Sequence, residues 1–363
     1  MSKRHTVAVI GLGIGRSHIA EGYARLRDQF DLQVICDLNE ERLASVGDEF
    51  EVARRTTSFD EVLGMDDIDI VDICTPPTLH FSQVMAALAA GKQVICEKPL
   101  VGSLHEVDQL AAAEATSRGR IMPVFQYRFG NGLQKARRIS ELGLAGKPYL
   151  ATIETAWLRG AAYYAVPWRG RFATELGGAL LTHAIHSHDI LTWLMGDIAS
   201  VYARTATRVN AIEVEDCAVA SLVMQSGALA SLAATLGSAK EISRIRLCFE
   251  HVTFESSLAP YAPGDDPWQI IATSPEAEMR IGKALEGFAF VPSRFEGFLA
   301  AYHQALETGG PLPVTLEDAR RSLELITALY HAAETGTAVA LPIDKDHPKY
   351  RSWRPGAGAA PQR

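Results

Sequence analysis

The sequence contains few cysteines, and none of them forms a C-x-x-C pair. Only five occur among 363 residues, at the widely separated positions 36, 74, 96, 217 and 248. An odd number of scattered cysteines argues against a disulfide framework and against a cysteine-based zinc site. Three of them close apolar segments in the first half, where a cysteine behaves as a small buried hydrophobe. We therefore expect reduced thiols in a cytoplasmic protein.

The sequence also lacks an excess of basic residues and any long apolar run. Thirty-five lysines and arginines face 43 acidic residues, which gives a formal charge of −8. This balance argues against nucleic acid or an anionic membrane as the main partner, although a local arginine cluster could still bind an anionic substrate. The apolar run after the N-terminal Met-Ser-Lys-Arg-His covers only residues 7–10. It is too short for a signal peptide, and no run reaches membrane-spanning length.

The length of the chain predicts two domains, because a single core rarely grows beyond about 250–300 residues. In residues 1–124, short β-branched segments alternate with segments of helical spacing. Such alternation is typical of a doubly wound parallel sheet with right-handed crossovers, the Rossmann architecture. From residue 125 the pattern changes to helices and consecutive strand segments. We expect an α+β domain with a large, mainly antiparallel open sheet over residues 125–343.

A glycine-rich loop follows the first predicted strand, residues 6–10. It reads Gly11-Leu12-Gly13-Ile14-Gly15, and a segment of helical spacing begins at Arg16. Glycines at such a turn allow a pyrophosphate to approach the backbone and the helix N-terminus. The spacing is one residue shorter than the usual G-x-G-x-x-G, so the loop needs support from its context.

Asp37 supplies that context at the end of the second predicted strand. It lies roughly twenty-odd residues after the glycines, where an acid is expected to bond the ribose hydroxyls of a dinucleotide. The alternative role, an N-cap of the following helix, is compatible with this one. The next residues are Leu38-Asn39-Glu40-Glu41, and their carboxylates would repel a 2′-phosphate. We therefore expect NAD, with NADP less favoured.

Two further loops follow predicted buried strands of the same sheet. Thr75-Pro76-Pro77 ends one strand, and Glu97-Lys98-Pro99 ends the next. Both loops should line the crevice at the carboxyl ends of the strands, where open α/β sheets bind their ligands. A solvated surface lysine is the alternative interpretation of Lys98.

In the second domain, the segment 159–171 is rich in aromatic and basic residues. Its side chains include Tyr163, Tyr164, Trp168, Arg169 and Arg171. Such a loop suits a polyhydroxylated ligand, and it suits packing on a neighbouring subunit about equally well. The tail, residues 344–363, is expected to be flexible or to dock on a partner through Tyr350 and Trp353.

A long helix is predicted from Gly177-Gly178 to about Met195. Helical spacing would place Thr182, His186 and Asp189 on one face, with His183 at its edge. A metal site at His183, His186, His188 and Asp189 is conceivable, but the chain offers no further well-spaced ligand, and we predict no metal. His188 fits a buried core histidine better than His186 does.

Taken in order, these motifs resemble the glucose–fructose oxidoreductase and inositol dehydrogenase family, Gfo/Idh/MocA, over nearly the whole chain. The residues that carry the resemblance are the glycine loop with His18, Cys74-Thr75-Pro76-Pro77, Glu97-Lys98-Pro99, Gln126-Tyr127-Arg128-Phe129, Gly177-Gly178-Ala179-Leu180, His186, Asp189, Pro313-Val314-Thr315, Tyr330, Gly336 and Leu341-Pro342.

The resemblance implies specific roles for these residues. Lys98 matches the catalytic lysine of the family, and His186 matches its active-site histidine. A cis peptide often precedes the matching proline, here Pro99. The acid usually found four residues before the histidine is replaced by Thr182, so His186 would need another orienting group or Lys98 would carry more of the chemistry.

The resemblance also implies two sets of binding residues. The cofactor-binding set comprises Gly11, Gly13, Ile14, Gly15, Asp37, Thr75, Pro76, Pro77, His80, Glu97 and Lys98. The substrate-binding set comprises Lys98, Tyr127, Arg128, Trp168, Arg169, Thr182, His183 and His186. A homodimer or homotetramer formed through the C-terminal sheet is implied as well.

The expected reaction is hydride transfer between a nicotinamide and a secondary hydroxyl of a sugar, cyclitol or glycoside, with Lys98 and His186 handling the proton. Three alternatives stay open. They are a glycosidase that oxidises its substrate transiently on NAD, a non-catalytic NAD-binding regulator, and a reductase of unsaturated or aromatic-derived substrates.

Overall fold

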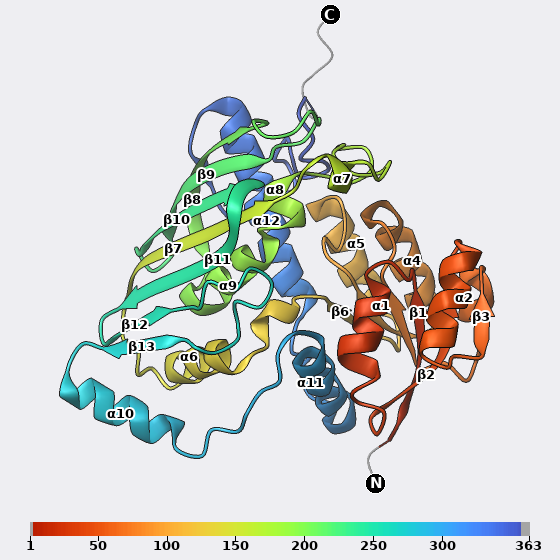
Figure 1. Ribbon diagram of the computed structural model, residues 1–363. Coiled ribbons are helices and arrows are strands. Elements are labelled where there is room, and N and C mark those ends of the chain that lie inside the picture. The colour runs from red at the N-terminus through yellow and green to blue at the C-terminus, as the bar shows by residue number, and fades with distance from the viewer. Residues whose placement is uncertain (1–2, 357–363) are drawn as a thin grey trace, which may run out of the picture. The chain divides into compact units, whose positions relative to one another are not determined.

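The computed structural model describes residues 3–356 and divides into two compact units (Figure 1). Unit 1 runs to Phe125 and also includes Phe295–Ala319; unit 2 comprises Gln126–Arg294 and the chain from Arg320 onward. The first boundary lies one residue from the expected one. The return of residues 295–319 to unit 1 differs from the contiguous division expected from the sequence.

Unit 1 is built on a six-stranded parallel sheet of order β3-β2-β1-β4-β5-β6. Its strands are β1 (His5–Ile10), β2 (Phe30–Cys36), β3 (Arg54–Thr56), β4 (Ile70–Ile73), β5 (Gln93–Cys96) and β6 (Ile121–Pro123). The strand order reverses between β1 and β4, which creates a crevice at the carboxyl ends of the strands. The doubly wound parallel fold is confirmed.

The helices of unit 1 connect these strands. They are α1 (Gly15–His18), continued by the π-helical turn η1 (Ile19–Tyr23), then α2 (Glu40–Glu49), α3 (Phe59–Leu63), α4 (Pro77–Ala89) and α5 (Leu104–Glu114). The start of α5 shows how the sequence fixes an end: Ser103 Oγ accepts from the N–H of Glu106, and the Glu106 carboxylate accepts from the N–H of Gly102. The first bond is that of the predicted capping box; in the second, Glu106 accepts from the residue before the N-cap and not from the N-cap itself.

Helix α11 (Arg294–Thr308) explains why a late segment belongs to unit 1. Its apolar face buries Phe295, Phe298, Leu299 and Tyr302. A Cβ added at Gly22 of η1 would lie 2.5 Å from Leu299 Cδ1, so this glycine lets the two helical segments approach closely. Burial of these large side chains, and not chain order, therefore decides the assignment of α11.

Unit 2 is built on an eight-stranded sheet of order β13-β12-β11-β7-β10-β9-β8-β14. Its strands are β7 (Pro148–Leu158), β8 (Ile198–Ala206), β9 (Cys217–Met224), β10 (Leu229–Thr235), β11 (Gly237–Phe249), β12 (Val252–Glu255), β13 (Gln269–Ala272) and β14 (Val339–Ala340). Only the β7–β10 pair is parallel among these described strands. The expected large, mainly antiparallel sheet is confirmed.

Unit 2 also contains several helical segments. They are the 3₁₀ turn η2 (Gln126–Arg128), α6 (Asn131–Glu141), α7 (Ala161–Tyr164), α8 (Ala179–Thr182), α9 (Ile185–Met195), α10 (Pro275–Leu285) and α12 (Leu316–Thr335), whose first four residues are assigned to unit 1. Of these, α8 and α9 pack on the sheet. Thr155 of β7 and Ser187 of α9 share a hydrogen bond of 3.1 Å, which joins this helix to the sheet. Over residues 3–356, no helix combines the length and apolar character that crossing a membrane requires.

The end of the described chain packs on unit 2 itself. Tyr350 and Trp353 are buried, and the Trp353 indole N–H donates to the carbonyl oxygen of Leu176 at 2.7 Å. Residues 344–356 thus differ from the flexible or partner-docking tail expected from the sequence. Residues 357–363 of that expected tail lie outside the described residues.

Candidate active site

The glycine loop joins β1 to α1 in unit 1. Gly11 has φ of +86°, and a Cβ there would lie 2.8 Å from the carbonyl oxygen of Cys74. A Cβ at Gly15 would lie 2.9 Å from Val9 Cγ1, whereas one at Gly13 would meet no atom within 4 Å. Gly11 and Gly15 are therefore required by the fold, while Gly13 leaves open space above the backbone for a ligand.

Asp37 is buried at the end of β2 and holds the glycine loop directly. Its Oδ2 accepts from the N–H of Leu12 at 2.7 Å, and its Oδ1 accepts from the N–H of Asn39 at 2.8 Å. Arg42 also reaches this carboxylate, with Nη1 3.2 Å from Oδ2. The helix cap is Asn39, whose side chain accepts from the N–H of Arg42. Asp37 therefore does not serve as the N-cap of α2.

The Thr75-Pro76-Pro77 loop opens α4 after β4. His80 of α4 is buried, with Nδ1 2.9 Å from the carbonyl oxygen of Pro99 and Nε2 2.8 Å from that of Thr75. Burial lowers the pKa of His80, and the two carbonyl acceptors oppose this change. His80 thereby ties together the two loops at the carboxyl ends of β4 and β5.

Glu97-Lys98-Pro99 follows β5, and the Lys98–Pro99 peptide is cis. The backbone N–H of Lys98 donates to Glu97 Oε2 at 2.9 Å, while Glu97 Oε1 lies 3.0 Å from His18 Nε2. The other ring nitrogen of His18 lies 2.8 Å from Asp72 Oδ2. A chain of buried polar groups therefore runs from β4 through His18 to the backbone of Lys98.

The charges in this chain support one another. Burial lowers the pKa of His18, but the charge and hydrogen bond of Asp72 outweigh it and raise that pKa well above its usual value. Burial raises the pKa of Glu97, but His18 and then Lys98 outweigh burial and lower it. An imidazolium thus stands between two buried carboxylates, and both ring N–H groups donate.

In unit 2, His186 lies in the first turn of α9 and stacks on Tyr127 of η2. The two ring centroids are 4.2 Å apart with an interplanar angle of 23°. The next residue, Arg128, makes a bidentate pair with Asp189, one helical turn after His186; the two N–O distances are 2.7 and 2.6 Å. This pair anchors η2 to α9 and so fixes the ring that covers His186.

The helix expected from Gly177-Gly178 to Met195 is broken. His183 and Ala184 lie between α8 and α9, and Thr182 Oγ1 lies 2.6 Å from His183 Nδ1. The prediction that Thr182, His186 and Asp189 share one face of a continuous helix is wrong for this reason. His188 is buried, and burial lowers its pKa to about 3, as expected for a neutral core histidine.

The aromatic and basic segment 159–171 forms stacked layers around two arginines. The Arg169 guanidinium lies 3.8 Å from the centre of the Tyr163 ring and 4.5 Å from that of Trp168. Arg159 lies over Trp157 and pairs with Glu241. Burial lowers the pKa of Arg169, although Glu175 opposes the change. The aromatic rings of this segment therefore stack on arginines of the same segment.

Comparisons with known proteins place this geometry in a family. A model described as an oxidoreductase family with an NAD-binding Rossmann fold matches residues 5–125, and the GFO/IDH/MocA C-terminal domain matches residues 133–255. The chain belongs to the GFO/IDH/MocA oxidoreductase family.

Three similar proteins illustrate the range of this family. The 1,5-anhydro-D-fructose reductase of Ensifer adhaerens is 28% identical over 83% of this chain and 88% of its own length. The myo-inositol 2-dehydrogenase of Thermotoga maritima is 30% identical over 61% of this chain and 66% of its own. The solved structure of the WlbA dehydrogenase from Bordetella pertussis, in complex with NADH and UDP-GlcNAcA, has a TM-score of 0.81 and 28% identity, and the match covers 94% of this chain and all of that one.

This GFO/IDH/MocA protein is therefore an NAD-binding oxidoreductase, and its first unit fits the cofactor. The open space over Gly13 would suit a pyrophosphate, and the Asp37 carboxylate lies at the end of β2, where this architecture is expected to hold the ribose hydroxyls. The spacing Gly11-x-Gly13-x-Gly15, one residue short of the usual pattern, is compatible with this fit.

Two functional candidates were missed by the sequence reasoning. Arg42 gives Asp37 a cationic neighbour that the run Leu38-Asn39-Glu40-Glu41 did not suggest. Glu215 is buried and accepts from the N–H of Leu180 at 2.9 Å and from the Tyr330 hydroxyl at 2.8 Å. Burial raises its pKa to about 7, although these hydrogen bonds oppose the change. The adjacent acids at 215 and 216, directly before an apolar strand, were the available signal.

Proposed function

We propose that this oxidoreductase transfers a hydride between NAD and a secondary hydroxyl of a sugar, cyclitol or glycoside, with Lys98 and His186 handling the hydroxyl proton. The observation that carries the proposal is the buried chain from Asp72 through His18 and Glu97 to the backbone of Lys98. A solvated surface lysine would need no such support. Lys98 also follows β5 at the carboxyl edge of the sheet, where this architecture binds its ligands.

In the proposed reaction NAD supplies the hydride chemistry, and the protein supplies position and proton transfer. The Lys98 ammonium donates a hydrogen bond to the reacting oxygen and stabilises the negative charge that develops there. His186 takes the proton as a general base. The Tyr127 ring stacked on it and the Arg128–Asp189 pair keep its imidazole in one orientation.

Thr182 occupies the position where the resemblance implies an acid. Its hydroxyl donates to the carbonyl oxygen of Gly178 at 2.8 Å and lies 2.6 Å from His183 Nδ1. A hydroxyl cannot stabilise an imidazolium as a carboxylate does. We therefore propose that Lys98 bears more of the transition-state charge than His186.

The chemistry of the relatives supports the substrate class. Their names include a reductase of 1,5-anhydro-D-fructose and a dehydrogenase of myo-inositol, and the WlbA structure holds UDP-GlcNAcA. The substrate roles of Tyr127, Arg128, Trp168, Arg169, Thr182 and His183 stay predictions. Of these, Arg128 is occupied by Asp189, so we assign it a positioning role through Tyr127.

NAD is proposed as the cofactor in preference to NADP because a buried carboxylate, Asp37, follows β2, where an acid is expected to bond the ribose hydroxyls. The roles of Ile14, Thr75, Pro76, Pro77 and His80 in binding it stay predictions. Arg42 is a nearby cation that could attract a 2′-phosphate. Its guanidinium is already paired with Asp37, which favours the unphosphorylated ribose.

We also propose a homodimer or homotetramer formed through the open face of the second sheet. Neighbouring strands place Leu150, Leu229 and Val223 in one exposed row, and Val219 lies nearby on the same face. An exposed apolar patch of this kind is typical of a protein interface. A cytoplasmic location is proposed from the five free cysteines.

The function is tested by following NADH formation at 340 nm across cyclitols, free hexoses, glycosides and anhydrosugars, with NAD and NADP in parallel. The proposal expects turnover of at least one class with NAD. His186→Ala should lower kcat, whereas the matched variant His251→Ala, on the turn after β11, should not. Inactivity of every polyol with both cofactors would overturn the proposal, and glycoside cleavage without net NADH would indicate transient oxidation instead.

A further inference from the structure

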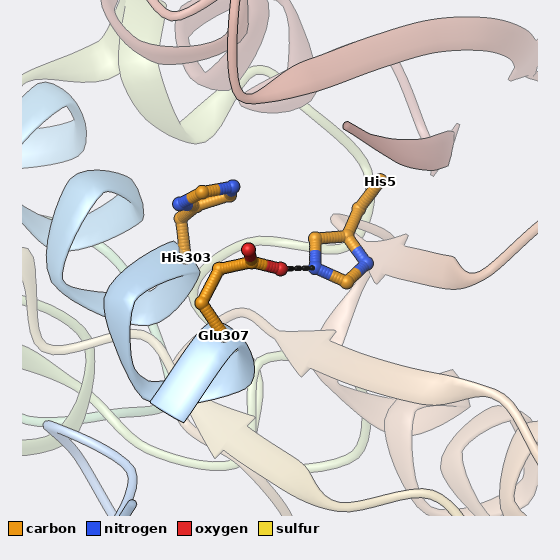
Figure 2. Close-up of side chains that lie close together, drawn as sticks. All are labelled: His5, His303 and Glu307. Atoms are coloured by element: carbon orange, nitrogen blue, oxygen red, sulfur yellow. Dashed lines mark ion pairs between the residues drawn. The ribbon is translucent and has the colours of Figure 1, made fainter. Parts of the chain in front are cut away.

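A cluster of two histidines and one glutamate lies in unit 1, apart from the residues assigned above to cofactor and substrate. His5 is the first residue of β1, and His303 and Glu307 lie one turn apart on α11. Figure 2 shows these three side chains, with Glu307 extended toward the His5 ring. Segments almost 300 residues apart in the sequence therefore bring three metal-ligating side chains together.

The three side chains are close enough to share one ion. One ligand atom from each lies within 4.8 Å of the other two, and His5 Nε2 lies 3.4 Å from Glu307 Oε1. Two ligand atoms on one tetrahedral zinc, each about 2.0–2.1 Å from the metal, are separated by roughly this distance. The two imidazole centroids are 5.6 Å apart in an edge-on arrangement.

His5 has a buried nitrogen that the protein does not satisfy. Within residues 3–356, no group makes a well-aligned hydrogen bond to His5 Nε2; this atom is shielded from solvent and has only the long, 3.4 Å contact with the Glu307 carboxylate. A buried nitrogen without a partner costs free energy. A cation between His5 Nε2 and Glu307 Oε1 would remove that cost.

The groups around the cluster resemble the outer layer of a metal site. His303 Nε2 lies 3.0 Å from the carbonyl oxygen of Lys3, and His5 Nδ1 lies 3.8 Å from Asp69 Oδ2. Metal-binding histidines commonly donate their second N–H to a carbonyl or a carboxylate, which leaves the other nitrogen free for the metal. His303 shows this arrangement, which leaves its Nδ1 as a ligand atom. The 3.8 Å contact of His5 Nδ1 with Asp69 is too long for a hydrogen bond, and His5 offers Nε2, the nitrogen that faces Glu307.

The Glu307 carboxylate has one oxygen left for an ion. The backbone N–H of Lys3 donates to Glu307 Oε2 at 2.9 Å. The other oxygen, Oε1, faces His5 Nε2 at 3.4 Å and is therefore the ligand atom that this side chain offers.

We propose that His5, His303 and Glu307 bind one divalent transition-metal ion of the zinc class. Two imidazoles and one carboxylate form a donor set that suits zinc. The Glu307 side chain is 28% exposed, which leaves a path for the ion and for a water as fourth ligand. The ion joins α11 to β1 within unit 1 and acts as a structural link. It takes no part in hydride transfer.

The experiment uses the untagged full chain, because a polyhistidine tag would bind the same ions. After chelator treatment and dialysis, Zn²⁺ binding is measured by calorimetry, and the ligand field is read from the visible absorption of Co²⁺. The variants are His303→Gln and Glu307→Gln, and the matched control is His251→Gln in unit 2. Circular dichroism checks that each variant is folded.

The proposal expects one Zn²⁺ per chain, a tetrahedral Co²⁺ band, and a rise in Tm on adding Zn²⁺. Either ligand variant should weaken Zn²⁺ binding by more than about tenfold, since loss of an outer partner alone costs 10–100-fold. The control should bind as the wild type does. The proposal would be overturned if Zn²⁺ does not bind stoichiometrically, or if Glu307→Gln binds Zn²⁺ as tightly as the wild type. Because Glu307 is partly exposed, the Glu307→Gln variant tests the proposal even if His303→Gln fails to fold.

Discussion

Replacing Arg128 by methionine should destabilise unit 2 and also disturb the orientation of His186. The Arg128 and Asp189 side chains are only 3% and 1% exposed, and their bidentate contacts are 2.7 and 2.6 Å. Methionine keeps much of the side-chain volume but leaves the Asp189 carboxylate buried without its cation. Breaking a buried pair in this way costs about 3–5 kcal/mol. At about 2–4 °C per kcal/mol for a unit of this size, Tm should fall by roughly 6–20 °C.

The assay is calorimetric unfolding combined with steady-state kinetics. The matched control is Arg138→Met, an exposed position on α6, which should change the free energy of unfolding by less than about 1 kcal/mol. The double variant Arg128→Met/Asp189→Leu should lose less stability than Arg128→Met alone, because an apolar pair can replace a buried ion pair at little cost. If Arg128→Met unfolds like the wild type, or if the double variant loses the sum of both single effects, the reasoning fails.

Four further outcomes follow from the buried groups and the exposed sheet face. Burial raises the pKa of Glu215 from 4.5 to about 7, so its protonated form stabilises the fold most below pH 4.5. About 3 kcal/mol of this stabilisation is lost as pH rises toward 7. Over this range Tm should therefore fall more in wild type than in Glu215→Gln. His18→Gln removes the cation between two buried carboxylates, so both Tm and kcat should fall, and an unchanged kcat would argue against its positioning role. Asp37→Asn, which keeps an acceptor for the N–H of Leu12, should raise the KM for NAD at least about tenfold while affecting that for NADP less, and equal effects on both would contradict the ribose assignment. Val219→Glu on the exposed sheet face should lower the mass measured by light scattering, and an unchanged mass would remove that face as the interface.

The parallel sheet of unit 1 was predictable because its signals are local. The strands β1, β4 and β5 are short β-branched runs, the loops that follow them carry glycine or proline, and Ser103 with Glu106 marks a helix start. The short strand β3, Arg-Arg-Thr, has no such signal. The positions of Asp37 and Lys98 at strand ends follow from the same local pattern. The cis peptide before Pro99 is confirmed, but its expectation came from family resemblance and not from spacing.

The features that escaped the sequence are the non-local ones. Arg128 and Asp189 were both noticed, yet their pairing joins residues 61 positions apart, and periodicity cannot show this. The break at His183 was missed because its apolar neighbours suit a continuous helix. Phe295 returns to unit 1 because a late helix buries its apolar face there, which the order of the chain does not reveal.

The most direct test of the central claim is the single-turnover rate of NADH formation by Lys98→Met at saturating NAD and substrate. Because removal of one donor that stabilises a developing oxyanion costs about 10²–10³-fold, the rate should fall by at least about 10²-fold. The Kd for NAD, measured by calorimetry, should stay within about threefold of the wild-type value, a change of less than 1 kcal/mol. A rate within fivefold of wild type, with about the same affinity for NAD, would contradict the role assigned to Lys98.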